Sequence, residues 1–337
     1  MSATVSIRRL VLSLSAVCSM SILSVAQASP AILNAAYDVT RELYKDINPA
    51  FSAEWKKKTG ETITVNQSHG GSSKQARSVI DGMEASVVSM NQASDIDIIA
   101  EKGLIKTNWA QSLPNQSAPF YSTMVFLTRK GNPKKVQDWA DLARPDVKVI
   151  IPNPKTSGNG RYSYLAAWGA VLQGGGNEAQ ARQLVTQIIK NVPVLDAGGR
   201  GATTTFTQKE IGDVLVTFEN EVQLIKQEFG DKYEVVYPKI SILADSPVAV
   251  VDKVVDKLGT RQQAQAYLQF LYSDAGQEII AKHYFRPRSE AIYKKYANNF
   301  RNLQLFSVDQ VFGGWKQIQK KHFDDGAEFD KIFASHK

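Results

Sequence analysis

Between residues 31 and 102, hydrophobic positions follow two spacings that alternate along the chain. Short apolar or alternating runs predict strands, and runs with apolar residues three or four positions apart predict helices. The predicted strands are Ala31–Tyr37, Thr62–Gln67 and Val87–Met90, and the helices after them cover 40–58, 75–83 and 96–102. This order is typical of an α/β fold with a mostly parallel sheet flanked by helices. We expect the loops after the strands to meet at one sheet edge, where such sheets bind ligands.

Two long apolar runs, Ser122–Arg129 and Ile242–Val251, interrupt this order. We predict that the first carries the chain into a second body and that the second brings it back. Lobe I would then comprise residues 29–121 plus 245–337, and lobe II residues 122–244. Within lobe II we expect strands at 147–151, 192–195, 214–218 and 233–237, and helices at 162–172, 179–190 and 219–229. Further helices are expected at 264–272, at 273–282 and after Ser307.

The N-terminus has the pattern of a secretory signal peptide. Arg8 and Arg9 precede an apolar stretch, and Ala26-Gln27-Ala28 is an A-x-A cleavage site, so we expect residues 1–28 to be removed after Ala28. Removing the two arginines lowers the formal charge from +7 to +5, without the basic stripe of a nucleic-acid-binding protein. The one cysteine, Cys18, lies in the signal, which excludes disulfides and thiol chemistry afterwards.

Small residues collect where predicted strands lead into helices. Three such loops are His69–Ser73, Ser157–Gly160 and Gly198–Gly201, and Asp38–Thr40 occupies the same position without glycine. The first turn of a helix has N–H groups without internal partners and a partial positive charge, which together favour anions. One such loop is most simply an ordinary helix cap. Four of them, distributed over two bodies, indicate a shared anion site.

Other kinds of site fit the sequence poorly. Gly-x-x-x-x-Gly-Lys-Ser/Thr does not occur at these loops, and the Gly-x-Gly at Gly199–Gly201 lacks the third glycine of a dinucleotide loop. The Ser72 segment lacks the closing glycine of a nucleophile elbow. With four histidines and no paired ligands, we expect no metal, no cofactor and no catalytic residue.

A tetrahedral dianion fits better. Fully ionised sulfate only accepts hydrogen bonds, so its site needs backbone N–H groups and hydroxyls. Each hydrogen bond to a charged partner contributes about 1.5–3 kcal/mol. Phosphate keeps a proton near neutral pH and needs an acceptor as well, and Asp38 leaves that alternative open.

Several motifs resemble those of the bacterial periplasmic sulfate- and thiosulfate-binding proteins, over essentially the whole chain after the signal. They are Tyr37–Leu43, Gln67–Gln75, Arg129–Lys134, Pro152–Asn159 and Phe312–Trp315. The resemblance implies a two-lobed periplasmic binding protein of type II, with the anion in the interlobe cleft. Such proteins close by a hinge motion. It also implies a monomeric periplasmic receptor that delivers sulfate or thiosulfate to an inner-membrane ATP-binding-cassette permease.

The resemblance assigns roles to individual residues. Those expected to contact the anion are Asp38, Ser72, Ser157, Gly158, Asn159 and Gly199. Ser157 would use its hydroxyl, and Asp38, Gly158, Asn159 and Gly199 their backbone N–H groups. His69, Arg161 and Arg200 would lie behind the site and act on the peptide units without touching the ligand.

Two positions depart from the sulfate binders. Phe218 stands where those proteins carry a tryptophan whose N–H reaches the ligand, and Asn91-Gln92 stands where they tend to have small apolar residues. Both departures are closer to the thiosulfate branch, so we expect both anions to bind, with thiosulfate at least as good. The alternatives are a receptor for phosphate or molybdate and, from another class, an ester hydrolase.

Overall fold

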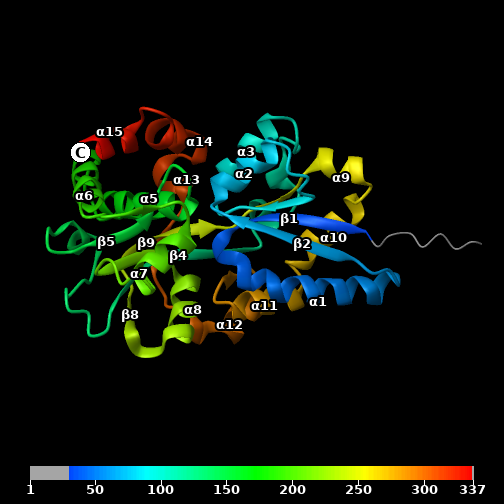
Figure 1. Cartoon of the computed structure of the whole chain (residues 1–337), viewed down its shortest axis with the longest axis horizontal. Coiled ribbons are helices and arrows are strands. Elements are labelled where there is room, and N and C mark those ends of the chain that lie inside the picture. Colours follow the sequence, from blue (N-terminus) through cyan, green and yellow to red (C-terminus); the bar gives the residue numbers. More distant parts are fainter. Residues whose placement is uncertain (1–29, 336–337) are drawn as a thin grey trace, which may run out of the picture.

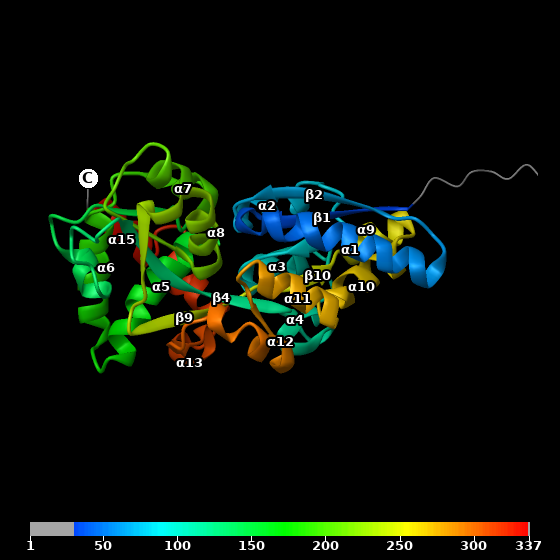
Figure 2. The same ribbon diagram turned by 90° about the horizontal axis from the view of Figure 1, so that it is seen from below.

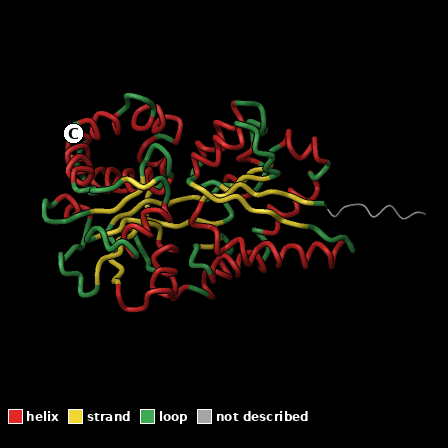
Figure 3. The backbone as a smooth tube through the Cα atoms, viewed as in Figure 1, coloured by secondary structure: helices red, strands yellow, loops and turns green. Residues whose placement is uncertain are grey.

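A computed structural model describes residues 30–335, and two bodies lie side by side along its long axis (Figure 1). Each body has a sheet with helices packed around it (Figure 3). This confirms the expected two-lobed α/β fold. The expected signal peptide, residues 1–28 with cleavage after Ala28, lies outside the described residues.

The sheet of lobe I has four strands in the order β10-β3-β1-β2. Strand β1 runs parallel to β2 and β3, and β10 is antiparallel to β3. The strands are β1 (Ala31–Tyr37), β2 (Thr64–Gly70), β3 (Val87–Ser89) and β10 (Val248–Val250). Successive β1 side chains face opposite ways, so Ala35 joins one apolar cluster while Ile32 and Ala36 join another.

Helices cover both faces of this sheet (Figure 1). Helices α2 and α3 pack together on one face, while α1 and α11 pack together on the other. The helical segments of lobe I are η1 (Asp38–Thr40), α1 (Arg41–Thr59), α2 (Ser72–Ile80), α3 (Ala93–Glu101), η2 (Trp109–Gln111), α4 (Pro114–Ser117), α9 (Asp252–Leu258), α10 (Arg261–Phe270) and α11 (Asp274–Lys282). Apolar side chains thus separate the sheet from solvent on both faces.

The sheet of lobe II has eight strands, with the order β12-β9-β4-β7-β5-β6 and with β8 and β11 also paired to β4. The strands are β4 (Phe120–Arg129), β5 (Val149–Pro152), β6 (Leu195–Asp196), β7 (Val214–Phe218), β8 (Tyr233–Val236), β9 (Ile240–Asp245), β11 (Arg286–Pro287) and β12 (Gln304–Phe306). We expected a mostly parallel sheet, but β4 is antiparallel to β7, β8, β9 and β11. Strands β4 and β9 carry the chain between the lobes in opposite directions (Figure 2), so they pair antiparallel. Because β5 is parallel to β6 and β7, the sheet as a whole is mixed.

Four longer helices surround this second sheet: α5 (Gly158–Gln173), α6 (Glu178–Lys190), α7 (Gly199–Thr207) and α8 (Glu219–Phe229). The shorter segments are η3 (Trp139–Ala143), η4 (Gly230–Lys232), α13 (Val308–Phe312), α14 (Trp315–Ile318), the π-helical turn η6 (Gln319–Phe323) and α15 (Glu328–Ala334). Two further segments follow β11, namely α12 (Glu290–Lys295), which packs on α11 of lobe I, and η5 (Ala297–Asn299). Helix α5 begins at Gly158, four residues before the predicted start, so the small-residue loop forms its first turn.

The last part of the chain lies elsewhere than we predicted. We placed all of 245–337 in lobe I, but β12 pairs in parallel with β9, α13 packs on α5, and α15 packs on α6 (Figure 1). Phe306 of β12 is buried and its ring fills the space beside Gly169 of α5, where a methyl group would lie 2.2 Å away. Residues 304–334 therefore complete lobe II.

Two predicted strands also differ in length. The apolar run from Ile242 to Val251 is divided into β9 and β10, because Ser246 and Pro247 lie between them and proline has no N–H for a ladder. The strand predicted at 192–195 shrinks to the two residues of β6, and Pro193 lies just before them.

Candidate functional site

Lobe I contributes three loops to the face that meets lobe II. Each loop follows one of the parallel strands, so the ladder fixes their relative positions: Tyr37 pairs with Gly70, and Ala36 pairs with Ser89. Asp38 begins η1 directly after β1, Ser72 begins α2 after β2, and Asn91 follows β3. Three predicted residues therefore reach the same sheet edge.

Lobe II contributes the start of two helices. Ser157 is the N-cap of α5, with Gly158 and Asn159 as the first helical residues, and Gly199 is the first residue of α7. The Ser157 hydroxyl makes no capping bond to its own helix, although the residue is only 2% exposed. Neither N-cap residue caps its own helix with a side chain, so first-turn N–H groups are left for acceptors from elsewhere, and at α7 the Arg200 N–H donates to Asp38 of lobe I.

The two walls meet with almost no space between their backbones. A methyl group at Gly71 would lie 2.6 Å from the carbonyl oxygen of Thr156 and 3.0 Å from that of Ala197. A methyl group at Gly158 would lie 1.8 Å from Oδ1 of Asn91. These glycines permit lobe-to-lobe contacts that any side chain would block, so the lobes are closed against each other.

Further contacts connect the remaining site residues. Oδ2 of Asp38 accepts a hydrogen bond from the backbone N–H of Arg200 across the lobes, at 3.1 Å. The backbone N–H of Asn91 donates to the Ser72 hydroxyl at 3.3 Å. The Asn159 amide donates to the Thr217 hydroxyl at 2.8 Å and also lies beside Gly199. The structure thus brings together all six residues predicted to contact the anion.

The Asp38 carboxylate is occupied by the protein itself. It is directed at the start of α7, where a methyl group at Gly198 would lie 2.5 Å from its Oδ2. Burial raises the pKa of Asp38, and the Arg200 N–H and guanidinium oppose that shift. The bond to Arg200 uses one of the two carboxylate oxygens. Asp38 can therefore still accept a further hydrogen bond, and this contact does not separate phosphate from sulfate.

The three residues expected behind the site differ in charge. Burial, with Arg41 nearby, lowers the pKa of His69 to about 4, so its ring is neutral at pH 7 and brings no charge. Arg161 is 6% exposed, and its Nε donates to the Pro154 carbonyl at 2.8 Å, within the loop that leads to Ser157. Arg200 pairs with Glu42 of lobe I and lies 3.4 Å from Glu221.

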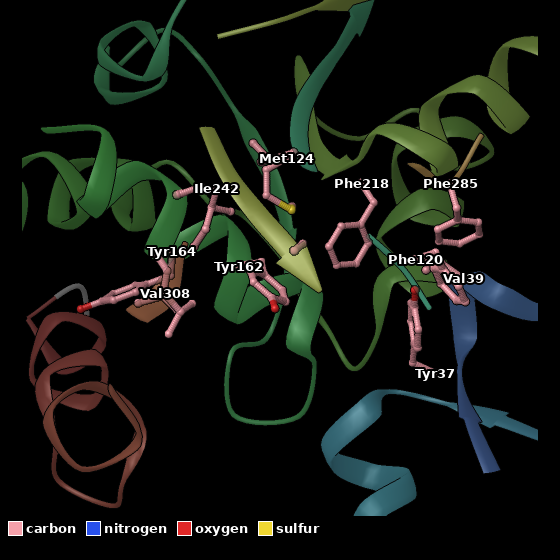
Figure 4. Packing of buried hydrophobic residues seen from close by; sticks show 14 of the residues in the cluster. Tyr37, Val39, Phe120, Met124, Tyr162, Tyr164, Phe218, Ile242, Phe285 and Val308 are labelled. Carbon is pink, nitrogen blue, oxygen red and sulfur yellow. The ribbon is translucent and has the colours of Figure 1, made fainter. Parts of the chain in front are cut away.

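Both positions that depart from the sulfate binders are buried at the lobe contact. Asn91 is 3% exposed, and its Oδ1 has no hydrogen-bond partner. Phe218 is 2% exposed and lies between the rings of Tyr37 and Tyr162, with centroids 6.3 and 5.9 Å away (Figure 4). Both side chains therefore form part of the contact between the lobes, Asn91 against Gly158 and Phe218 against Tyr37.

Sequence reasoning missed residues that form the lobe contact. Gly71 and Gly198 allow the close approach, and Glu42 pairs across the lobes. Glu221 is fully buried, accepts from the Thr203 hydroxyl at 2.9 Å, and has its pKa raised to about 7 by burial. In the sequence, Glu221 belongs to a polar run that begins at Glu219 and starts an amphipathic helix. In the structure this run is buried.

Two features are missing from residues 30–335. They contain no cluster of three or more His, Cys, Asp or Glu side chains that could hold a metal ion. Within the same range, every helix is too short or too polar to cross a membrane.

Comparison with known proteins gives concordant results. The model of the bacterial extracellular solute-binding protein family matches residues 32–286. The chain is 57% identical over 311 residues to a thiosulfate-binding protein of Pseudomonas aeruginosa, covering 92% of this chain and 94% of that protein. It is 55% identical over 303 residues to a sulfate-binding protein of Escherichia coli K12, covering 89% and 92%.

A solved structure agrees with these matches. The sulfate-binding protein SubI from Mycobacterium tuberculosis H37Rv superposes with a TM-score of 0.80 at 30% identity, covering 88% of this chain and 100% of that one. These similarities confirm the resemblance that the motifs indicated. The chain is a member of the bacterial extracellular solute-binding protein family, in the group that contains the sulfate- and thiosulfate-binding proteins.

Proposed function

We propose that this protein is the periplasmic receptor that captures sulfate and thiosulfate for an ATP-binding-cassette importer. The observation that carries the proposal is the lobe contact, where two helix starts without side-chain caps face the loops of lobe I. Their donors suit an anion that only accepts hydrogen bonds. The matched relatives are a thiosulfate-binding and a sulfate-binding protein.

In this proposal the anion lies between the lobes. The backbone N–H groups of Asp38, Gly158, Asn159 and Gly199 donate to it, together with the Ser157 hydroxyl. The Ser72 oxygen accepts from Asn91 and its hydroxyl hydrogen points to the Met90 sulfur at 3.5 Å, so the hydroxyl turns from this weak acceptor to donate to the anion. Closure removes the ion from water, and several charge-assisted bonds of about 1.5–3 kcal/mol each replace its hydration.

The two departing residues set the preference between the anions. Phe218 offers a ring edge instead of an N–H donor, which costs sulfate one hydrogen bond and suits the larger, softer sulfur end of thiosulfate. The Asn91 amide lies against the first residue of α5, and in this proposal its NH₂ donates to the ligand. Thiosulfate therefore binds at least as well as sulfate.

The wider setting is also proposed. The chain is exported, is cleaved after Ala28, works as a monomer in the periplasm and presents its closed form to an inner-membrane permease. It has no catalytic role. A receptor for phosphate or molybdate is the nearest alternative, and the acceptor that phosphate needs would be the second oxygen of the Asp38 carboxylate, which the bond to Arg200 leaves open.

A thermal-shift panel tests the proposal. Sulfate and thiosulfate should each raise the Tm according to ligand concentration over Kd, and phosphate and molybdate should not. Calorimetry then ranks the two sulfur anions, and sulfate binding much more tightly than thiosulfate would contradict the assigned preference. Phe218→Trp should raise the ratio of sulfate to thiosulfate affinity. Product released from an incubated sulfate or phosphate ester would favour the hydrolase instead.

A further inference from the structure

A lysine lies within the anion-binding loop but is directed away from the site. Lys155 is two residues before Ser157, and a cation at this position would be expected to attract the ligand. Its Nζ instead donates to the Phe323 carbonyl at 2.9 Å, to Asp325 at 3.0 Å and to Asp330 at 3.1 Å. All three acceptors belong to the C-terminal segment, which lies beside α5 and α6 in lobe II (Figure 1).

The same segment holds the loop from its other side. Nη1 of Arg161, in the first turn of α5, donates to Oε1 of Gln319 at 2.9 Å. Its guanidinium also lies over the Phe323 ring, 5.0 Å from the centroid. Residues on both sides of Ser157 are therefore tied to residues 319–330, which we call the C-terminal brace.

Local bonds shape this loop, and two further bonds attach it to the segment before α7: the Asn153 N–H donates to the Asp196 carbonyl at 2.7 Å, and the Thr156 hydroxyl donates to the Ala197 carbonyl at 3.0 Å. The backbone N–H groups of Thr156 and Ser157 both donate to the Asn153 carbonyl, at 3.1 and 2.9 Å. The bonds to Asn153 shape the turn, and those to Asp196 and Ala197 hold it on the side of α7. The three contacts of Lys155 hold it on the opposite side, because they connect the loop to a segment that packs on the helices of the same lobe.

We infer that Lys155 is a positioning residue, which holds the loop against the C-terminal brace so that Ser157, Gly158 and Asn159 stay aimed at the anion. An isolated surface ion pair would contribute little. Lys155 differs because its side chain is only 25% exposed and has one backbone and two carboxylate acceptors. The two carboxylates also cancel its charge locally, so it acts through the loop and does not steer the ligand. Preorganised donors bind more tightly because less ordering accompanies binding.

The inference rests on the proposed function, and Lys155→Met tests it. We expect affinity for sulfate and for thiosulfate to fall alike, by about fivefold, as for the loss of one partly buried ion pair. The change should appear in the dissociation rate measured by stopped flow. The association rate and its salt dependence should stay as in the unchanged protein. Lys155→Arg should restore most of the affinity.

Lys321→Met is the matched control. Lys321 belongs to the same brace and pairs with Glu178 at 2.9 Å, but it makes no contact with the anion loop. The Lys321→Met variant should have a dissociation rate within about twofold of that of the unchanged protein, as expected for the loss of an exposed ion pair. Asp330→Asn should have a smaller effect in the Lys155→Met background than alone, because both changes break the same contact.

Hydrogen exchange separates this inference from the proposed function. Without any ligand, amides 157–161 should exchange faster in Lys155→Met than in Lys321→Met. If the unchanged protein bound neither anion, the proposed function would fail while the exchange result still decided the role of Lys155. Unchanged exchange in Lys155→Met, or a loss confined to the association rate and its salt dependence, would overturn the inference.

Discussion

The two walls of the site place similar helix starts in different ways. In lobe I the loops at Asp38, Ser72 and Asn91 follow strands that pair with one another, so backbone ladders set their spacing. In lobe II the strand before Gly199 has only two residues, and the loop before Ser157, although it follows the ladder of β5, is also held by Asp325, which lies 170 positions further along the chain. A ladder tolerates changes of side chain, whereas the second kind of support depends on particular residues.

The largest effect should come from the contact between the walls. In Gly71→Ala, the new methyl group would meet the carbonyl oxygens of Thr156 and Ala197, which belong to the backbone of the opposite lobe. We expect anion affinity to fall about 100-fold by calorimetry, in line with the cost of overpacking, with the ligand-free Tm little changed. Gly70→Ala is the control, because a methyl group there would meet Gln75 at an ordinary 3.6 Å. Equal anion affinity in the two variants would rule out a close contact between Gly71 and the backbone of the opposite lobe in the ligand-bound state.

The next effect should come from one donor of the lobe II wall. Ser157→Ala removes a hydroxyl that makes no bond to its own helix. The loss of one charge-assisted bond predicts a fall in sulfate affinity of about tenfold or more, measured by calorimetry. Ser78→Ala, on the half-buried side of α2, should leave affinity unchanged. A fall in sulfate affinity of less than twofold in Ser157→Ala would show that this hydroxyl does not bind the anion.

A smaller effect is expected from the ion pair between the walls. Arg200 of α7 pairs with Glu42 of α1, and both side chains are about one-third exposed, at 30% and 32%. Glu42→Gln should weaken the closed state and lower affinity about threefold, mainly through faster dissociation, because a screened pair of this kind contributes little. The difference from the unchanged protein should shrink at high salt. A difference that stays constant up to 1 M salt would argue against an electrostatic role.

The last prediction concerns stability and not affinity, through pH and the buried carboxyl beside Arg200. The pKa of Glu221 is raised to about 7 from an ordinary 4.5, so the folded state holds its proton more tightly than the unfolded state. The stability from this group is complete below pH 4.5 and is lost as pH rises through 7. In the ligand-free protein, Glu221→Gln should therefore flatten the fall in Tm between about pH 5 and 8. Parallel Tm curves for the two proteins would contradict this titration.

The sequence was sufficient to predict individual strands and helix starts, but not the contacts between segments far apart in the chain. The run Ala31–Tyr37 is a strand in the structure as predicted, because its alternating side chains enter two apolar clusters. The helix starts at Ser157 and Gly198 were visible because small residues follow apolar strands. The place of residues 304–334 was not visible, since the pairing of β12 with β9 joins segments about sixty residues apart and leaves no local signal.

In the candidate site, too, local features could be predicted and long-range contacts could not. Residue types at the helix starts indicated anion chemistry, but the neutral state of His69 depends on its burial and on Arg41, which only the fold brings near. Glu42 and Glu221 read as ordinary helix surface positions, although they flank Arg200 at the lobe contact. Charges that act across lobes cannot be assigned from the spacing of residues within one helix.

The course of the chain has a consequence for the order in which the protein can form. Strand β10 of lobe I comes after most of lobe II, and the C-terminal brace of lobe II lies within the last twenty residues. A chain emerging from the ribosome therefore cannot complete either lobe until most of it has been made. Lys155 finds its partners only when Asp325 and Asp330 have appeared. The loop before Ser157 thus reaches its final support only after a segment more than 160 positions later in the chain has folded against it.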